Sequence, residues 1–261
     1  SPNNAPGLST AKIAVALNGA IGIEITTFTV SVDAPALALP SAFNFTSTHR
    51  LNYDEATQSS ATETFESANP GWTVSGNAVN MPNIVPWQLR ALSPVDHVFF
   101  GPDNNGQVDD SKASLPDQQI LTSPSFTVGT GTFTIGFRHR FSFESGNWDG
   151  GVVEISTNGG ATWTKIGTAG SPYNGSTNAG TSAPIGAATP AFVGRSSGWP
   201  LFINSTFNLG TTYANQTVQI RFRTGSDDST GAPGWDIDDI ALTGVTSTPF
   251  TALVPETGTC P

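Results

Sequence analysis

Charged side chains are scarce in this chain, and basic ones are the scarcest. Only 11% of its 261 residues are charged, against roughly 25% in an ordinary soluble domain. Ten Lys and Arg oppose twenty Asp and Glu, which gives a formal net charge of −10 at pH 7. Because no basic run offsets this charge locally, the composition argues against nucleic acid as a partner. An acidic surface of this kind suits cations instead, calcium above all.

Cysteine and long apolar runs are also nearly missing. The single cysteine, Cys260, excludes an internal disulfide and a multi-cysteine zinc site. Since no apolar run reaches about 18 residues, the sequence predicts no membrane span. Low charge with abundant Thr, Ser, Asn and Gly is typical of secreted β proteins, so we expect an extracellular location.

The residues that are abundant favour strands. The chain has 28 Gly, 19 Pro, 16 Phe and 6 Trp, enough apolar surface for a sizeable core and few strong helix formers. From Ile135 to Phe143 apolar residues and His139 occupy every second position, as in a strand with one buried face. We interpret His139 as a core residue. The Asn158-Gly159 turn between two strand-like runs predicts a hairpin.

These patterns predict an all-β fold built as an antiparallel β-sandwich. Strand alternation alone leaves jelly-roll and immunoglobulin-like topologies open. We predict a small β unit or partial Ig-like domain over residues 1–61, the sandwich over 62–246 and a C-terminal tail over 247–261. The Gly- and Pro-rich stretch 168–198 is expected to be a long loop of the kind that often carries function.

Motifs for catalysis are incomplete, so we expect no catalytic residues and no enzymatic activity. Residues 194–198 match G-x-S-x-G, but no histidine follows His139 as a nucleophile elbow requires. The sequence contains no H-E-x-x-H zinc motif. Glu144 and Glu154 keep one alternative open, that the chain is part of a secreted hydrolase, because a glycosidase needs two carboxylates in one cleft.

Carboxylates beside Gly-rich turns are the stronger signal. Acidic groups occur at Glu66, at Asp149 and in the late run Asp238-Asp239. Calcium takes about six to eight oxygen ligands, which carboxylates and backbone carbonyls from distant segments supply together. We therefore expect calcium as a structural cofactor, with solvated acidic turns as the alternative. The stretches 103–110 and 227–228 are interpreted as solvated loops.

Several motifs together resemble a family of bacterial extracellular modules similar to MAM domains. The likeness spans residues 62–246 and rests on these segments: Phe65-Glu66, Gly71-Trp72, Phe100-Gly101-Pro102-Asp103, residues 121–124, residues 137–144, residues 149–160 and Gly234-Trp235-Asp236-Ile237-Asp238-Asp239-Ile240. The resemblance implies a jelly-roll fold and an accessory role in large secreted proteins, metallopeptidases among them. It also implies a cation held by Glu66 with Asp238 or Asp239, and less directly by Asp149.

The resemblance leaves the ligand open. We expect a noncatalytic, calcium-stabilised accessory module that attaches its parent protein to an extracellular surface, a polymer, a glycan or a neighbouring domain. The alternative is a carbohydrate-binding module, because loop aromatics at Trp148, Tyr173 and Trp199 offer faces for sugar rings. Trp148 stands where the family more often has Tyr or Phe, which hints at a stacking surface.

Overall fold

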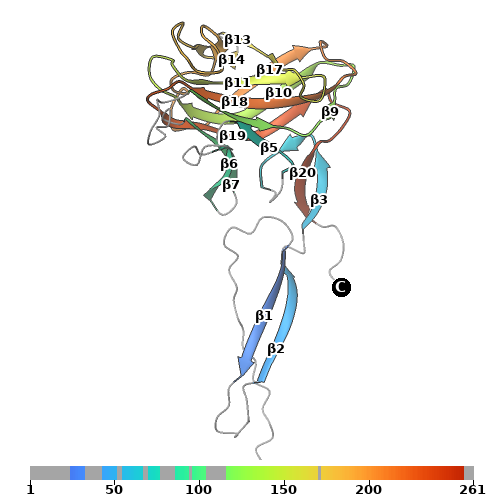
Figure 1. Cartoon of the computed structure of the whole chain (residues 1–261). Coiled ribbons are helices and arrows are strands. Elements are labelled where there is room, and N and C mark those ends of the chain that lie inside the picture. Colours follow the sequence, from blue (N-terminus) through green and yellow to red (C-terminus); the bar gives the residue numbers. More distant parts are fainter. Residues whose placement is uncertain are drawn as a thin grey trace, which may run out of the picture.

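The fold is described by a computed structural model for residues 24–32, 43–51, 55–66, 70–76, 86–93, 96–103, 116–169 and 172–255. These residues form strands and turns without a helix, so the all-β prediction is confirmed (Figure 1). Within these ranges no helix is long and apolar enough to cross a membrane. Cys260 lies outside the described residues.

One sheet of the sandwich, sheet 1, has the antiparallel order β17-β10-β19-β7-β6, and a short strand β4 also pairs with β19. Its strands are β17 (Ile203–Gly210), β10 (Phe133–Ser142), β19 (Ala232–Thr243), β7 (Asp96–Asp103), β6 (Gln88–Ser93) and β4 (Thr62–Glu63).

The facing sheet, sheet 2, has the antiparallel order β12-β11-β18-β8-β5, with β9 also paired to β18. Its strands are β12 (Thr164–Lys165), β11 (Gly150–Ser156), β18 (Thr217–Ser226), β8 (Asp117–Thr122), β5 (Thr73–Gly76) and β9 (Phe126–Thr127).

The strand order identifies a jelly roll. Along the chain the main strands alternate between the sheets: β7, β10, β17 and β19 lie in sheet 1, while β8, β11 and β18 lie in sheet 2. The four-strand sets β17-β10-β19-β7 and β12-β11-β18-β8 are those of two interleaved Greek keys. The structure thus decides the topology that strand alternation left open, and β5 and β6 extend the two sheets at one edge.

Alternation along β10 divides the apolar core from the outer face of sheet 1. Phe137, His139 and Phe141 are at most 3% exposed, whereas Arg138 and Arg140 between them face outward. His139 accepts a hydrogen bond from Trp235 Nε1 (3.1 Å), and its Nε2 lies 2.9 Å from Ser205 Oγ. Burial lowers the pKa of His139 to about 3, so it is a neutral core histidine, as predicted.

Sheet 2 is buried on both faces at β11, where every residue is buried. The outer face is covered by the connection from β12 to β17, which contains β13 (Thr168–Ala169), β14 (Pro172–Tyr173), β15 (Gly175–Ser176) and β16 (Pro190–Ala191) (Figure 1). Val152 of β11 packs there against Ile185 and Val193. The described part of the loop at 168–198, expected to carry function, thus covers sheet 2.

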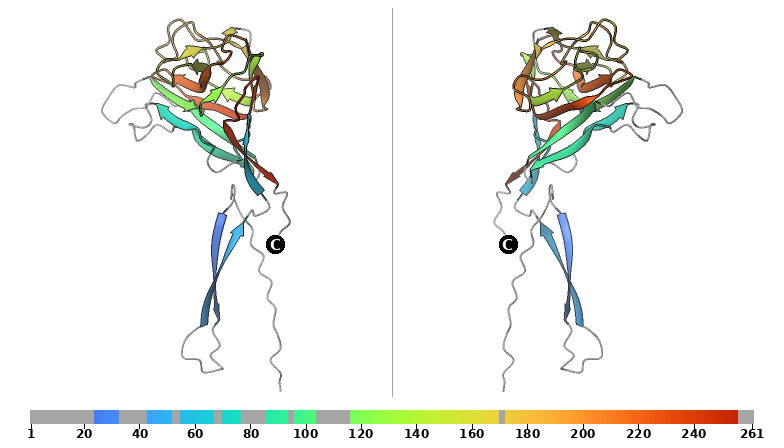
Figure 2. Two further views of the ribbon diagram at one scale, coloured as in Figure 1. Left: turned by 90° about the vertical axis from the view of Figure 1, so that its right-hand side faces the viewer. Right: turned by 90° about the vertical axis from the view of Figure 1, so that its left-hand side faces the viewer.

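Strand β3 (Glu55–Ser60) pairs with β20 (Phe250–Pro255), so segments from near the two ends of the chain lie side by side (Figure 2). Phe250 is 1% exposed and stacks on Trp72, with ring centroids 5.7 Å apart. Part of the predicted tail 247–261 is therefore a strand that contributes to the core.

Within 1–61, β1 (Glu24–Val32) and β2 (Phe43–Leu51) form a separate two-stranded antiparallel sheet. An independent unit over 1–61 stays a prediction.

We predict that Phe250→Ala lowers the free energy of unfolding by about 3–5 kcal/mol, because it removes a buried ring and leaves a cavity beside Trp72. Urea denaturation of the whole chain measures this loss. The control is Leu201→Ala at a side chain that is 70% exposed, which should change stability by less than about 0.5 kcal/mol. Equal effects of the two substitutions would show that β20 is not part of the core.

Candidate functional site

A groove of about 200 Å³ lies on the outer face of sheet 1. Its floor comes from the four neighbouring strands β10, β19, β7 and β6, and its wall comes from the loop that precedes β17. The residues that line it are Arg90, Phe100, Arg140, Trp199, Pro200, Pro233, Gly234 and Asp236. We call this set the arginine groove.

Strand pairing brings the charged residues of the arginine groove together. Arg140 of β10 stands opposite Asp236 of β19, and Asp236 stands opposite Phe100 of β7. Asp236 is only 3% exposed and accepts hydrogen bonds from two arginines: Arg90 Nη2 at 2.5 and 2.7 Å, and Arg140 Nε at 2.7 Å. One buried carboxylate therefore fixes both guanidinium groups.

Aromatic rings pack against the guanidinium groups of the same two arginines. Arg90 Cζ lies 4.1 Å from the centroid of the Phe100 ring. Arg140 Cζ lies 4.6 Å from the ring centroid of Phe202 and 5.8 Å from that of Trp199. Arg140 Nη1 also donates to the backbone carbonyl of Pro200 at 3.0 Å. The loop that carries the half-buried Trp199 is thereby tied to sheet 1 beside the groove.

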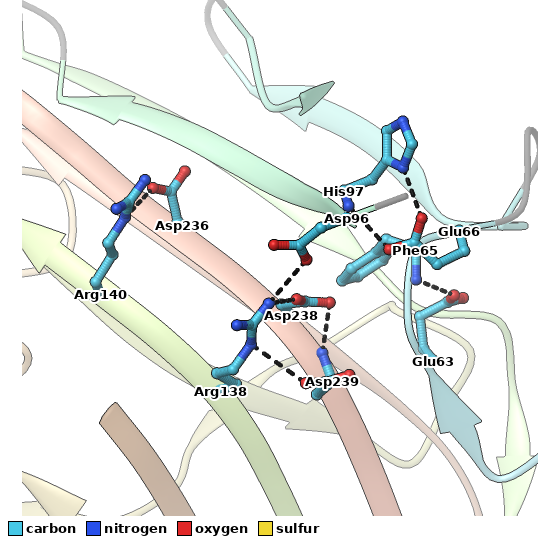
Figure 3. A network of polar contacts seen from close by, with 10 residues as sticks. All are labelled: Glu63, Phe65, Glu66, Asp96, His97, Arg138, Arg140, Asp236, Asp238 and Asp239. Atoms are coloured by element: carbon cyan, nitrogen blue, oxygen red, sulfur yellow. Dashed lines mark hydrogen bonds and ion pairs between the residues drawn. The ribbon is translucent and has the colours of Figure 1, made fainter. Parts of the chain in front are cut away.

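A second polar cluster surrounds Arg138 and contains two of the predicted calcium ligands, Asp238 and Asp239 (Figure 3). Arg138 pairs with the buried Asp238, with Asp96 at 3.0 Å and with Asp239 at 3.2 Å. Burial raises the pKa of Asp238 to about 6. Arg138 therefore already supplies a positive charge to Asp238 and Asp239, which makes these carboxylates a poor fit for calcium.

Glu66, the third predicted ligand in this region, is engaged by His97 instead. It accepts a hydrogen bond from the His97 backbone N–H at 2.8 Å, and its Oε2 lies 2.6 Å from His97 Nδ1 (Figure 3). Nearby, Glu63 was not singled out from the sequence, yet it is fully buried and accepts hydrogen bonds from Phe65 N–H and Trp72 Nε1. Burial raises the pKa of Glu63 to about 7.

The fourth predicted ligand, Asp149, belongs to a different cluster. Oxygens of Glu144, Asp149 and Asp227 lie within 4.8 Å of one another, and we call these three residues the carboxylate cluster. Asp149 is fully buried: one oxygen accepts the Asp227 backbone N–H at 2.7 Å, and its carboxyl group also shares a side-chain hydrogen bond with Asp103. Burial, followed by the charge of Asp103, raises the pKa of Asp149 to about 9.

Asp103 and Asp227 correct the sequence analysis, which placed both in solvated loops. Asp103 is 5% exposed and Asp227 is 8% exposed. Asp103 accepts hydrogen bonds from Ser226 Oγ at 2.6 Å and from the Glu144 backbone at 3.2 Å. These bonds bring Asp103 and the segment around Asp227 together at one end of the sandwich. Burial raises the pKa of Asp103 to about 7. Among the residues that the structure describes, no arginine is paired with the carboxylate cluster, so it fits calcium better than the Arg138 cluster does.

The three predicted aromatic ligand-binding residues do not form one surface. Trp199 lines the arginine groove. Trp148 is half-buried, and its backbone carbonyl accepts a hydrogen bond from Thr181 Oγ1 at 2.6 Å. Tyr173 is 1% exposed, and its hydroxyl accepts a hydrogen bond from the Val153 N–H at 2.9 Å. A ring buried in the core has no face for a ligand, which corrects the prediction for Tyr173.

The two glutamates of the hydrolase alternative have separate partners. Glu154 is buried on sheet 2 and paired with Arg221 at 2.6 Å and Arg223 at 2.7 Å. Glu144 belongs to the carboxylate cluster.

The sequence analysis missed Arg90, Arg140 and Asp236 as site residues. The alternation from Ile135 to Phe143 predicted one buried face, which leaves Arg138 and Arg140 on the other face, but strand pairing was needed to locate a groove there.

No protein-family model and no curated protein sequence matches the chain. Similar solved structures include TmCBM61 in complex with β-1,4-galactotriose, with 13% identity over 68% of this chain and 96% of that one and a TM-score of 0.37. The K1 cleaved adhesin domain of Lys-gingipain from Porphyromonas gingivalis shows 12% identity over 72% of this chain and 98% of that one, with a TM-score of 0.38. The C-terminal CBM6 of LamC from Zobellia galactanivorans shows 14% identity over 72% of this chain and 99% of that one, with a TM-score of 0.32. These distant likenesses carry no argument about function, and the MAM-like relationship stays a prediction.

Proposed function

We propose that this chain is a noncatalytic binding module that takes an extracellular glycan in the arginine groove. The observation that carries the proposal is the placement of Trp199 beside fixed arginines in an open hollow on sheet 1. Sugar rings stack on aromatic faces, and their hydroxyls bond to directed polar groups, which is the combination this groove offers. We also propose that the module is part of a secreted multidomain protein and that it attaches this protein to the glycan.

The proposal predicts that Trp199→Ala weakens binding at least about tenfold, because one stacked ring is worth roughly 1–3 kcal/mol. Affinity electrophoresis against a panel of soluble neutral and acidic polysaccharides detects the interaction, and calorimetry measures it. The matched control is Trp163→Ala, which removes a half-buried tryptophan that stacks on Arg221 of sheet 2. Failure of the unchanged protein to bind any polysaccharide would contradict the proposal, as would equal losses in the two variants.

We further propose that calcium stabilises the module through the carboxylate cluster. Two observations support this: three carboxylates converge within 4.8 Å, and within the described ranges no arginine is paired with any of them. A hard divalent cation would offset the repulsion between buried carboxylates and bridge the start of β11 to the segment after β18. Glu144, Asp149 and Asp227 would hold it.

Calcium at about 100 times its Kd would then add about 2.7 kcal/mol, which raises the Tm by several degrees in a chain of this size. Thermal melts in millimolar calcium and in EDTA measure the shift. We expect Asp149→Asn to abolish the shift and Asp239→Asn, in the Arg138 cluster, to retain it. The reverse pattern would move the site to the Arg138 cluster, and no shift in the unchanged protein would remove the calcium proposal.

A further inference from the structure

The arginine groove is a positively charged place on a negatively charged protein. Arg90 and Arg140 face a single acidic lining residue, Asp236, and the other lining residues are uncharged. The groove therefore has a formal charge of +1, while the whole chain carries −10. The Debye length is about 8 Å at physiological salt, so distant acidic residues are screened from the groove. The neighbouring Arg138 cluster contains three aspartates and adds negative charge beside the groove. A ligand in the groove is therefore attracted by direct contact with Arg90 and Arg140 rather than by a wide positive field.

The two guanidinium groups are fixed before any ligand arrives. Asp236 holds one side of each, and the rings of Phe100, Phe202 and Trp199 contact their faces. Held this way, a guanidinium loses little side-chain entropy when it binds. A neutral sugar needs no such pair of cations, since hydroxyl groups are satisfied by uncharged donors and acceptors.

Donors remain after these internal contacts. Arg90 contacts Asp236 through Nη2, and its side chain is 38% exposed, so the residue stays accessible from the groove. Arg140 uses Nε and Nη1 for Asp236 and the Pro200 carbonyl, which leaves Nη2 without an acceptor in the described ranges. Unused guanidinium N–H groups match the oxygens of a carboxylate or a sulfate, and hydrogen bonds to such charged acceptors are about twice as strong as neutral ones.

We infer that the arginine groove selects an acidic sugar, with its anionic group between Arg90 and Arg140 and its ring against Trp199. This inference rests on the proposed glycan-binding function and names the ligand class for the same groove. A uronic-acid carboxylate and a sulfate ester share the required chemistry, namely a compact anion with several acceptor oxygens on a pyranose ring.

Calorimetry with three galactose-configured probes tests the inference: β-1,4-galactotriose as the neutral probe, trigalacturonate, and a sulfated galacto-oligosaccharide of the same length. EDTA is present throughout so that calcium does not bridge the acidic sugars to the protein. We expect at least one anionic probe to bind at least about tenfold more tightly than the neutral probe. Whether trigalacturonate or the sulfated probe binds better identifies the anionic group.

Arg90→Gln and Arg140→Gln should each lower the affinity for the preferred anionic probe about tenfold and lower the affinity for the neutral probe several-fold less than that. The matched control is Arg221→Gln, because Arg221 also pairs with a buried carboxylate and stacks on a tryptophan, but on sheet 2. If Arg140→Gln fails to fold, Arg140→Lys keeps the charge, loses the planar fork and should give an intermediate loss.

The outcomes separate this inference from the proposed function. Neutral and anionic probes that bind equally, with both bindings lost in Trp199→Ala, would retain the glycan-binding function and overturn the acidic selectivity. An equal loss in Arg221→Gln would also overturn it, by showing a response to net charge alone. Binding of no probe here and no polysaccharide in the wider panel would remove the function itself.

Discussion

The pairing of β10 with β19 determines both the core and the outer surface of sheet 1. Alternation along β19 puts Trp235 and Ile237 in the core and Asp236 and Asp238 on the outer side, where each meets an arginine from β10. A shift of one residue in this register would bury the carboxylates among aromatic rings. Core packing and the arrangement of the arginine groove therefore depend on one constraint.

Several carboxylates in this protein are buried, and two groups of them differ in their partners. Asp236, Asp238 and Glu154 are each paired with arginine. Asp149 instead lies beside other carboxylates, and burial strongly raises its pKa. Burial of a charge is costly unless an opposite charge compensates it. The carboxylate cluster is thus where a bound cation would change stability most, whereas the paired carboxylates gain little from one.

Local patterns in the sequence were sufficient for the strands, the neutral core histidine at position 139 and the outward arginines of β10, because alternation has a period of two. The jelly-roll topology followed only with the resemblance. The sites were harder, because they join residues far apart in the chain: Arg90 and Asp236 are 146 positions apart. Acidic and aromatic residue types alone could not tell Asp227 from a solvated residue, or Tyr173 from a surface ring.

The two sheets carry similar chemistry on their outer faces but differ in what covers it. On sheet 2, Glu154 pairs with Arg221, which stacks on Trp163, and the connection from β12 to β17 closes over the neighbouring Arg223. On sheet 1, Asp236 pairs with Arg140 beside Trp199, and the hollow stays open. A carboxylate, an arginine and a tryptophan thus stabilise a packed face in one sheet. In the other the carboxylate is equally buried, but the arginine and the tryptophan line an open hollow, which is why we place the proposed ligand on sheet 1.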